Sequence, residues 1–171
     1  MKHEISVQFG NEVDDLGTLD ADSVYFGERS CPDFFLRAMK PTRISETGKR
    51  IKDSGRNAYL YVPPLISQRY VEKVIRRIDA VHHIDAVLTS DIGIASSIEG
   101  KDAHYLGIAA NKEACVALKD IGFARVRQTL PYYNVLRGIS DAIKREVVIY
   151  GRIPLNYSRV QDAMQRADDV P

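Results

Sequence analysis

The residues of this chain that could do chemistry follow strand-like runs, at the point where each run ends. The clearest is Arg152, which comes between Gly151 and Pro154 directly after the β-branched run at residues 146–150. Its guanidinium offers a planar fork of N–H donors that matches a carboxylate or a phosphate. Five further polar side chains are placed in the same way: Glu28, Cys31, Asp91, Asn111 and Gln128. Because the carboxyl ends of parallel strands meet at one edge, where α/β proteins usually build sites, we expect a polar pocket there.

These six residues divide into two predicted roles, each with a structural alternative. The expected ligand-binding residues are Glu28, Asn111, Gln128 and Arg152, and the expected ligand is a small carboxylate. The candidates for a reactive group are Cys31, a thiol in a loop, and Asp91. In the alternative, Asp91 and Asn111 only cap helices by accepting bonds from backbone N–H groups. Glu28 and Arg152 would then form a rim salt bridge worth ~0–1 kcal/mol, and Gln128 would be plain surface.

Seven strand-like runs alternate with mostly helical segments. The predicted strands cover residues 4–9, 23–27, 58–62, 85–91, 104–108, 124–128 and 146–150. Helical patterns lie between them. The first starts at residue 42 or 45 and ends at residue 53, and the others cover residues 68–78, 92–98, 111–122 and 133–143. This alternation predicts right-handed βα units and a parallel sheet. No GxGxxG or GxxxxGK[ST] loop follows a strand, so an open nucleotide-binding sheet loses its main support.

The length of the chain favours a barrel that is not complete. An eight-fold barrel usually needs ~250 residues, whereas this chain has 171 and one strand fewer. We therefore predict an α/β fold in the form of an incomplete TIM-like (βα) barrel with about seven mostly parallel strands. It would occupy residues 1–156 as a single domain, followed by a polar C-terminal helix or tail at residues 157–171.

The missing strand also predicts a partner. Two strands would keep unpaired N–H and C=O groups, and such edges are normally covered. The loop after the second strand adds four large apolar residues, Phe34, Phe35, Leu36 and Met39, and contiguous apolar surface typically marks an interface. We expect a homodimer, or a heterodimer with a longer relative. In the alternative the tail covers the gap with the stripe Val160, Ala163, Met164 and Ala167.

Composition excludes several classes of protein. The net charge of +1 argues against a broad nucleic-acid surface, and no run approaches the ~18 apolar residues of a membrane span. The first ten residues lack the apolar core of a signal peptide, so we expect a cytoplasmic protein. Cys31 and Cys115 cannot form a disulfide scaffold, and Cys115 lies in a helical pattern where it is most simply a small core residue.

The histidines do not indicate a hydrolase. His82 and His83 lie in a helix-to-strand turn at the amino-terminal end of the sheet, while His3 and His104 fall at strand starts. Neither an HExxH zinc motif nor a GxSxG elbow occurs. The residues therefore give no mechanism for a peptidase.

Four segments in order, DADSVYFGE, DAVLTSDIG, IAANKEACVALKDIGFARVRQTL and EVVIYGRIPLNYS, carry a family resemblance. Together they resemble the collagenase-like peptidase family of unknown catalytic type, over about residues 20–160. The resemblance implies a barrel-like fold. It also implies a link to oxygen-independent hydroxylation of ubiquinone precursors or of RNA, in which members carry an iron–sulfur cluster on four cysteines and prephenate is implicated as oxygen donor.

The cluster itself is not expected in this chain. Cys31 stands where the ubiquinone branch of the family has its first cluster cysteine, but the segment Pro154-Leu155-Asn156-Tyr157-Ser158 is followed by no cysteine. One thiolate cannot hold a cluster that takes four. We therefore expect no cofactor and no metal in the isolated chain, with assembly between chains as the remaining route to a cluster.

Three functions follow from these observations. The first is a ligand-binding or accessory subunit beside a cluster-bearing relative, because the family's scaffold is present without its cluster ligands. The second is an enzyme in its own right, a hydroxylase-like or peptidase-like catalyst in which Arg152 holds a substrate carboxylate and Cys31 or Asp91 reacts. The third is an interaction module without a small ligand.

Overall fold

Seven parallel strands form one sheet in the order in which they occur along the chain. The computed structural model describes residues 6–8, 20–27, 40–63, 68–109, 111–129 and 143–148. The strands are β1 (Ser6–Gln8), β2 (Ser23–Phe26), β3 (Asn57–Tyr61), β4 (Ala86–Thr89), β5 (Asp102–Ile108), β6 (Phe123–Thr129) and β7 (Lys144–Val148). Each strand pairs in parallel with its neighbours in sequence, so the order is β1-β2-β3-β4-β5-β6-β7. Strands β2–β7 form the body of the sheet, and the three-residue β1 extends its edge.

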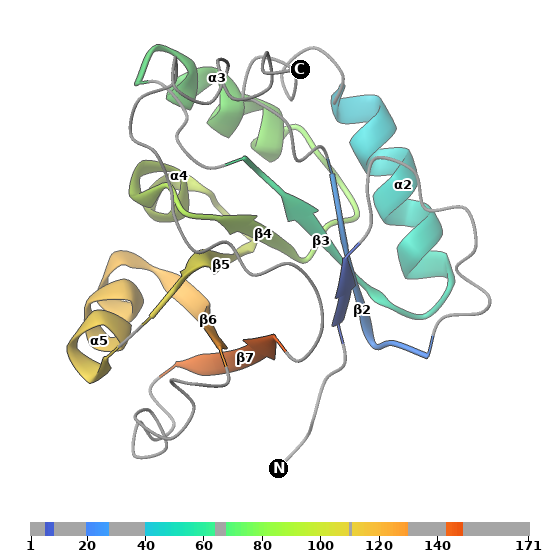
Figure 1. Cartoon of the computed structure of the whole chain (residues 1–171). Helices are drawn as coiled ribbons and strands as arrows, with labels where there is room; N and C mark the ends of the chain where they lie inside the picture. Colours follow the sequence, from blue (N-terminus) through green and yellow to red (C-terminus); the bar gives the residue numbers. More distant parts are fainter. Residues whose placement is uncertain are drawn as a thin grey trace, which may run out of the picture.

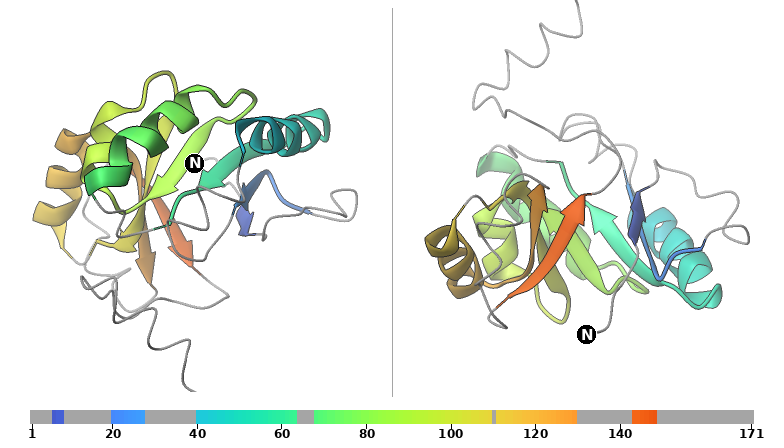
Figure 2. Two further views of the ribbon diagram at one scale, coloured as in Figure 1. Left: turned by 90° about the horizontal axis from the view of Figure 1, so that it is seen from above. Right: turned by 60° about the horizontal axis from the view of Figure 1, so that its bottom comes forward.

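The helices between the strands lie together on one face of the sheet. They are α2 (Pro41–Asp53), α3 (Gln68–Asp79), α4 (Ile92–Ser97) and α5 (Lys112–Ile121). Because the strand order never reverses, successive right-handed crossovers all place their helices on the same side. The helices follow one another around the outside of the strands (Figures 1 and 2). The result is an α/β half-barrel with a helix-covered convex face and a concave face, and not a doubly wound sheet.

Local sequence signals explain where these helices begin and end. Asp91 and Asn111 precede α4 and α5, and their side chains accept from the backbone N–H groups of Ile94 and Ala114. Pro41 starts α2, a position where its missing N–H has no cost. Gly122 ends α5 with a φ of 117°, a left-handed conformation that favours glycine.

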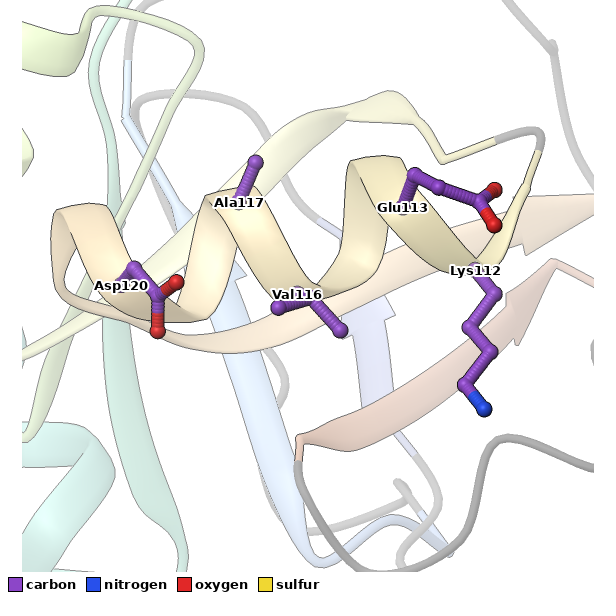
Figure 3. A pocket seen from close by; sticks show the side chains of 5 residues that line it. All are labelled: Lys112, Glu113, Val116, Ala117 and Asp120. Atoms are coloured by element: carbon purple, nitrogen blue, oxygen red, sulfur yellow. The ribbon is translucent and has the colours of Figure 1, made fainter.

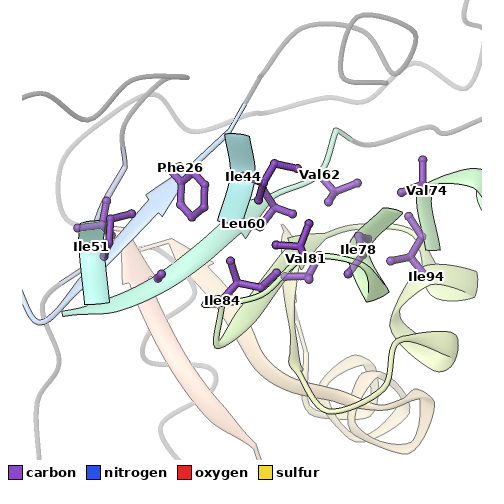
Figure 4. Close-up of a cluster of buried hydrophobic side chains, with 13 residues drawn as sticks. Phe26, Ile44, Ile51, Leu60, Val62, Val74, Ile78, Val81, Ile84 and Ile94 are labelled. Atoms are coloured by element: carbon purple, nitrogen blue, oxygen red, sulfur yellow. The ribbon is translucent and has the colours of Figure 1, made fainter. Parts of the chain in front are cut away.

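The main hydrophobic core lies between the convex face of β2–β4 and the helices. Side chains alternate along a strand, so Val24 and Phe26 of β2 point toward α2 while Tyr25 points to the concave face. Figure 4 shows the cluster that includes Ile44 and Ile51 of α2 and residues of α3 and α4. A second core packs α5 against β5 and β6, and it contains the fully buried Cys115 as predicted.

The amino-terminal end of the sheet is fixed by close backbone approaches. Asp85 accepts from Lys52 Nζ at 2.6 Å and from the backbone N–H of Ala58 at 2.9 Å. A Cβ on Gly48 of α2 would lie 2.6 Å from the carbonyl oxygen of His83, so only glycine permits this contact. His82 and His83 are exposed here, in the turn predicted for them.

All seven predicted strands and their parallel pairing are confirmed, with bounds that shift by a few residues. The predicted helix at residues 133–143 and the tail at residues 157–171 fall outside the described residues, apart from residue 143. Among the described residues, none of the helices combines the length and apolar character that crossing a membrane requires.

Candidate functional site

The concave face of the half-barrel carries a group of polar and aromatic side chains from five strands. We call them the concave-face cluster: Tyr25 (β2), Tyr59 (β3), His104 (β5), Arg125 and Arg127 (β6), and Glu146 (β7). Strand register places them, since Tyr25 lies beside Tyr59, His104 beside Arg125, and Arg127 beside Glu146. Apolar neighbours on the same face, among them Tyr61, Leu88 and Leu106, surround them.

Curling of the sheet is what brings these residues together. The Tyr25 hydroxyl on β2 donates to Glu146 Oε2 on β7 at 2.8 Å. In a flat sheet these two strands would be five spacings apart, about 24 Å, which is beyond the combined reach of the two side chains. This hydrogen bond therefore exists only because the sheet curls.

Hydrogen bonds of the Tyr25 hydroxyl link β2 to both β7 and β5. The hydroxyl lies 2.8 Å from Glu146 Oε2 and 2.7 Å from His104 Nδ1. A hydroxyl has one proton to donate, so if that proton goes to the Glu146 carboxylate, His104 must donate its own Nδ1–H to the Tyr25 oxygen. The geometry thus links the tautomer of His104 to the direction of the hydrogen bond between Tyr25 and Glu146.

Burial keeps the Tyr25 phenol neutral. Desolvation raises its pKa well above the ordinary value of 10.0, and the negative charge of Glu146 raises it further. The positive charges of Arg127 and Arg125 act in the opposite direction. Tyr25 is therefore a hydrogen-bond donor at neutral pH, not a phenolate.

Arg127 is the more exposed of the two arginines in the cluster. Its Nη2 and Nε lie 3.0 and 3.1 Å from Glu146 Oε1, and the two side chains are 13% and 15% exposed. The guanidinium carbon also lies 4.9 Å from the centre of the Tyr25 ring. Stacking on an aromatic ring and pairing with a carboxylate hold the fork of donors in one orientation.

Arg125, the second arginine of the cluster, is more deeply buried and also stacks on a tyrosine ring. Arg125 is 8% exposed, and its guanidinium carbon lies 5.5 Å from the centre of the Tyr59 ring. His104, 2% exposed, packs edge-on against Tyr59 with ring centres 4.7 Å apart. A register shift between β5 and β6 adds one residue, Ala124, which allows Phe123 to face the helices while Arg125 faces the concave side.

The six residues predicted as a site differ from the six described residues that define the concave-face cluster. Glu28, Cys31 and Arg152 lie outside the described residues. Asp91 and Asn111 follow β4 and β5 as expected, and both side chains accept backbone N–H groups as helix caps. For Gln128 the structure gives the backbone alone, paired with Val147 of β7.

Sequence signals for the cluster were present. Arg125 and Arg127 alternate with Ala124 and Val126 in a strand, which places two cations on the same face of a sheet. His104 and Glu146 were each predicted as the first residue of a strand, and the structure places them within β5 (Asp102–Ile108) and β7 (Lys144–Val148). Parallel strands are normally buried on both faces. Charged residues along one face of such a strand therefore indicate a polar site in the interior.

Other features of the described residues offer less chemistry. A shallow depression of about 400 Å³ lies on α5, and its lining residues are all exposed: Lys112, Glu113, Val116, Ala117 and Asp120 (Figure 3). The thiol of Cys115 is buried, and burial raises its pKa, so it is a poor nucleophile. In the part of the chain that the structure describes, no group of three or more His, Cys, Asp and Glu residues is placed to hold a metal ion.

Comparisons of the chain with protein-family models, with curated proteins and with solved structures give no match. The resemblance to the collagenase-like peptidase family therefore stays a prediction from the sequence. What the concave-face cluster offers chemically follows from its own geometry: an oriented guanidinium whose N–H donors pair with a carboxylate, beside a chain of hydrogen bonds through Glu146, Tyr25 and His104.

Proposed function

We propose that this protein is a ligand-binding or accessory subunit that holds a small carboxylate on the concave face of an incomplete TIM-like barrel. The observation that carries the proposal is Arg127, an oriented and partly exposed guanidinium on that face. Its pairing with Glu146 supports a carboxylate in particular, because the site already accommodates one carboxylate at this fork.

The surroundings of Arg127 favour binding. Hydrogen bonds between ionised groups are stronger than neutral ones, and low local dielectric strengthens them further. A guanidinium already held against an aromatic ring loses little side-chain freedom when a ligand binds, so less of the interaction energy is offset by ordering. Arg125, stacked on Tyr59, adds a second positive charge to the same face.

The pathway and the partner come from the family resemblance alone. We propose that the ligand is connected with oxygen-independent hydroxylation of ubiquinone precursors or RNA, and that a cluster-bearing relative supplies the redox chemistry. The edge strands β1 and β7 each pair with one neighbour among the described strands, which supports a homodimer or a heterodimer with a longer family member.

A catalytic role is the second candidate, and one observation favours it. Glu146, Tyr25 and His104 form a continuous hydrogen-bonded chain along which a proton can shift between a carboxylate and an imidazole. A hydroxylase-like or peptidase-like enzyme would need such a group within reach of a bound substrate. Turnover that Tyr25→Phe removes while ligand affinity is kept would distinguish this role from binding alone.

Calorimetry tests the binding function. Prephenate, chorismate and succinate are titrated into the wild type and into Arg127→Lys, which keeps the charge but removes the planar fork. We expect one of the ligands to bind the wild type, with at least a roughly tenfold loss in the variant, as for other charged hydrogen bonds. Arg76→Lys is the matched control, because Arg76 pairs with Glu72 on the exposed surface of α3. Equal, negligible heats from the wild type, Arg127→Lys and Arg76→Lys would refute the proposed binding of a carboxylate.

A further inference from the structure

Glu146 occupies the part of Arg127 that a ligand carboxylate would use. A single oxygen, Oε1, lies 3.0 Å from Nη2 and 3.1 Å from Nε, which together form one edge of the guanidinium. The other oxygen, Oε2, accepts the Tyr25 hydroxyl. Among the described residues Glu146 is the ion partner of Arg127, and an incoming anion therefore meets a guanidinium edge that already holds an anion.

We propose that Glu146 is an internal competitor for the ligand: it holds this edge of Arg127 in the empty site and yields it when a small carboxylate binds. The inference rests on the proposed binding function and adds a residue that sets its affinity. Two carboxylates at one guanidinium lie within the ~4–6 Å at which like charges disfavour each other's ionised form. Every carboxylate ligand must therefore overcome the attraction between Arg127 and Glu146.

The geometry permits Glu146 to move without losing all its partners. Its contact with Tyr25 uses the oxygen that does not touch Arg127, so that hydrogen bond can persist when Oε1 leaves the guanidinium. The pair is also at the accessible side of the cluster, with 13% and 15% exposure, whereas Tyr25 and His104 are almost fully buried. Rotation of the Glu146 carboxylate about its Tyr25 contact is the motion that opens the site.

The competitor role predicts that loss of the Glu146 charge raises the affinity for carboxylates, whereas a purely structural role predicts no such gain. Glu146→Gln keeps the size of the side chain but removes the charge. Its single amide oxygen can accept from Tyr25 or from Arg127, and its NH2 group then faces the other partner. If Glu146 competes, the variant binds carboxylates more tightly than the wild type does. If Glu146 only positions Arg127, the variant binds equally or more weakly, because the fork is less well held.

The experiment titrates the full chain with succinate and follows the Nε–H signal of Arg127 by NMR, assigned by its absence in Arg127→Lys. We expect at least about tenfold tighter binding by Glu146→Gln than by the wild type, the size of one charged hydrogen bond. Glu146→Asp, which draws the carboxylate back from the guanidinium, shifts in the same direction and serves if the glutamine variant fails to fold. Glu72→Gln is the matched control, because it removes the carboxylate of an Arg–Glu pair that is exposed on α3, and its affinity stays at the wild-type value.

The outcomes separate the two proposals. Binding by the wild type with no gain in either Glu146 variant overturns the competitor role and leaves the binding function in place. A lack of any shift in the wild type and in both variants overturns both proposals. Succinate binding that appears only when Glu146 is changed supports the competition between Glu146 and the ligand, and counts against the wild type as a binder of succinate.

Discussion

Replacing Tyr25 by Phe tests whether the hydroxyl at the centre of the concave-face cluster holds the curl of the sheet. The change removes one oxygen and leaves the ring, with its contacts to Tyr59 and Arg127, in place. It deprives Glu146 Oε2 and His104 Nδ1 of a partner. A hydrogen bond to a charged group contributes about 1.5–3 kcal/mol and a neutral one about 1 kcal/mol, so we expect a loss of roughly 3 kcal/mol in the free energy of unfolding.

Urea unfolding followed by circular dichroism measures this loss. In a domain of this size a loss of roughly 3 kcal/mol also lowers Tm by about 6–12 °C. Tyr105→Phe is the matched control, because Tyr105 lies on the other face of β5 against Phe123, and no described residue bonds to its hydroxyl. A loss below about 0.5 kcal/mol for Tyr25→Phe, similar to that of the control, would refute the view that this hydroxyl ties β2 to β5 and β7.

Three further predictions concern backbone, pH and assembly. Gly27→Ala should destabilise the fold by about 2–4 kcal/mol, because Gly27 has a φ of 134° and its Cβ would lie 2.7 Å from the Tyr61 carbonyl oxygen. The control Gly55→Ala, with a φ of 79° and open space around it, should cost about 1 kcal/mol in the same urea assay. Because the pKa of Tyr25 is raised in the folded state, its contribution is complete below the unfolded value of 10.0 and is lost as pH rises above it; the alkaline decline should be steeper in the wild type than in Tyr25→Phe. Light scattering should report a dimer, and a strictly monomeric mass would contradict a homodimer.

The order of elements was predictable because each strand and helix carries its own local signal. β4 reads as an unbroken buried run, and α5 is bounded by the cap Asn111 and by Gly122. Parallel pairing followed from the alternation of strands and helices. The barrel was preferred to an open, doubly wound sheet because no glycine-rich nucleotide loop follows a strand. These signals act within a few residues, so a single sequence displays them.

The site was not predictable in the same way, because it depends on curvature. The sequence predicts His104 and Glu146 each as the first residue of a strand. The two residues are 42 positions apart, and no local pattern shows that both contact the Tyr25 hydroxyl. Attention to strand ends, where α/β proteins usually build sites, also favoured Asp91 and Asn111, which the structure uses as caps. The alternation of Arg125 and Arg127 was the one pattern that indicated the interior.

The composition of the concave face is itself an argument for function. Removing Arg127 and Glu146 from water is costly, and their mutual attraction does little more than offset that cost. Apolar residues of similar size at these positions would often give a fold at least as stable. The half-barrel instead places a charged pair at the accessible side of a face that also carries buried tyrosines and leucines together with His104 and Arg125. Stability does not explain that choice, whereas the proposed role in admitting and releasing a carboxylate would.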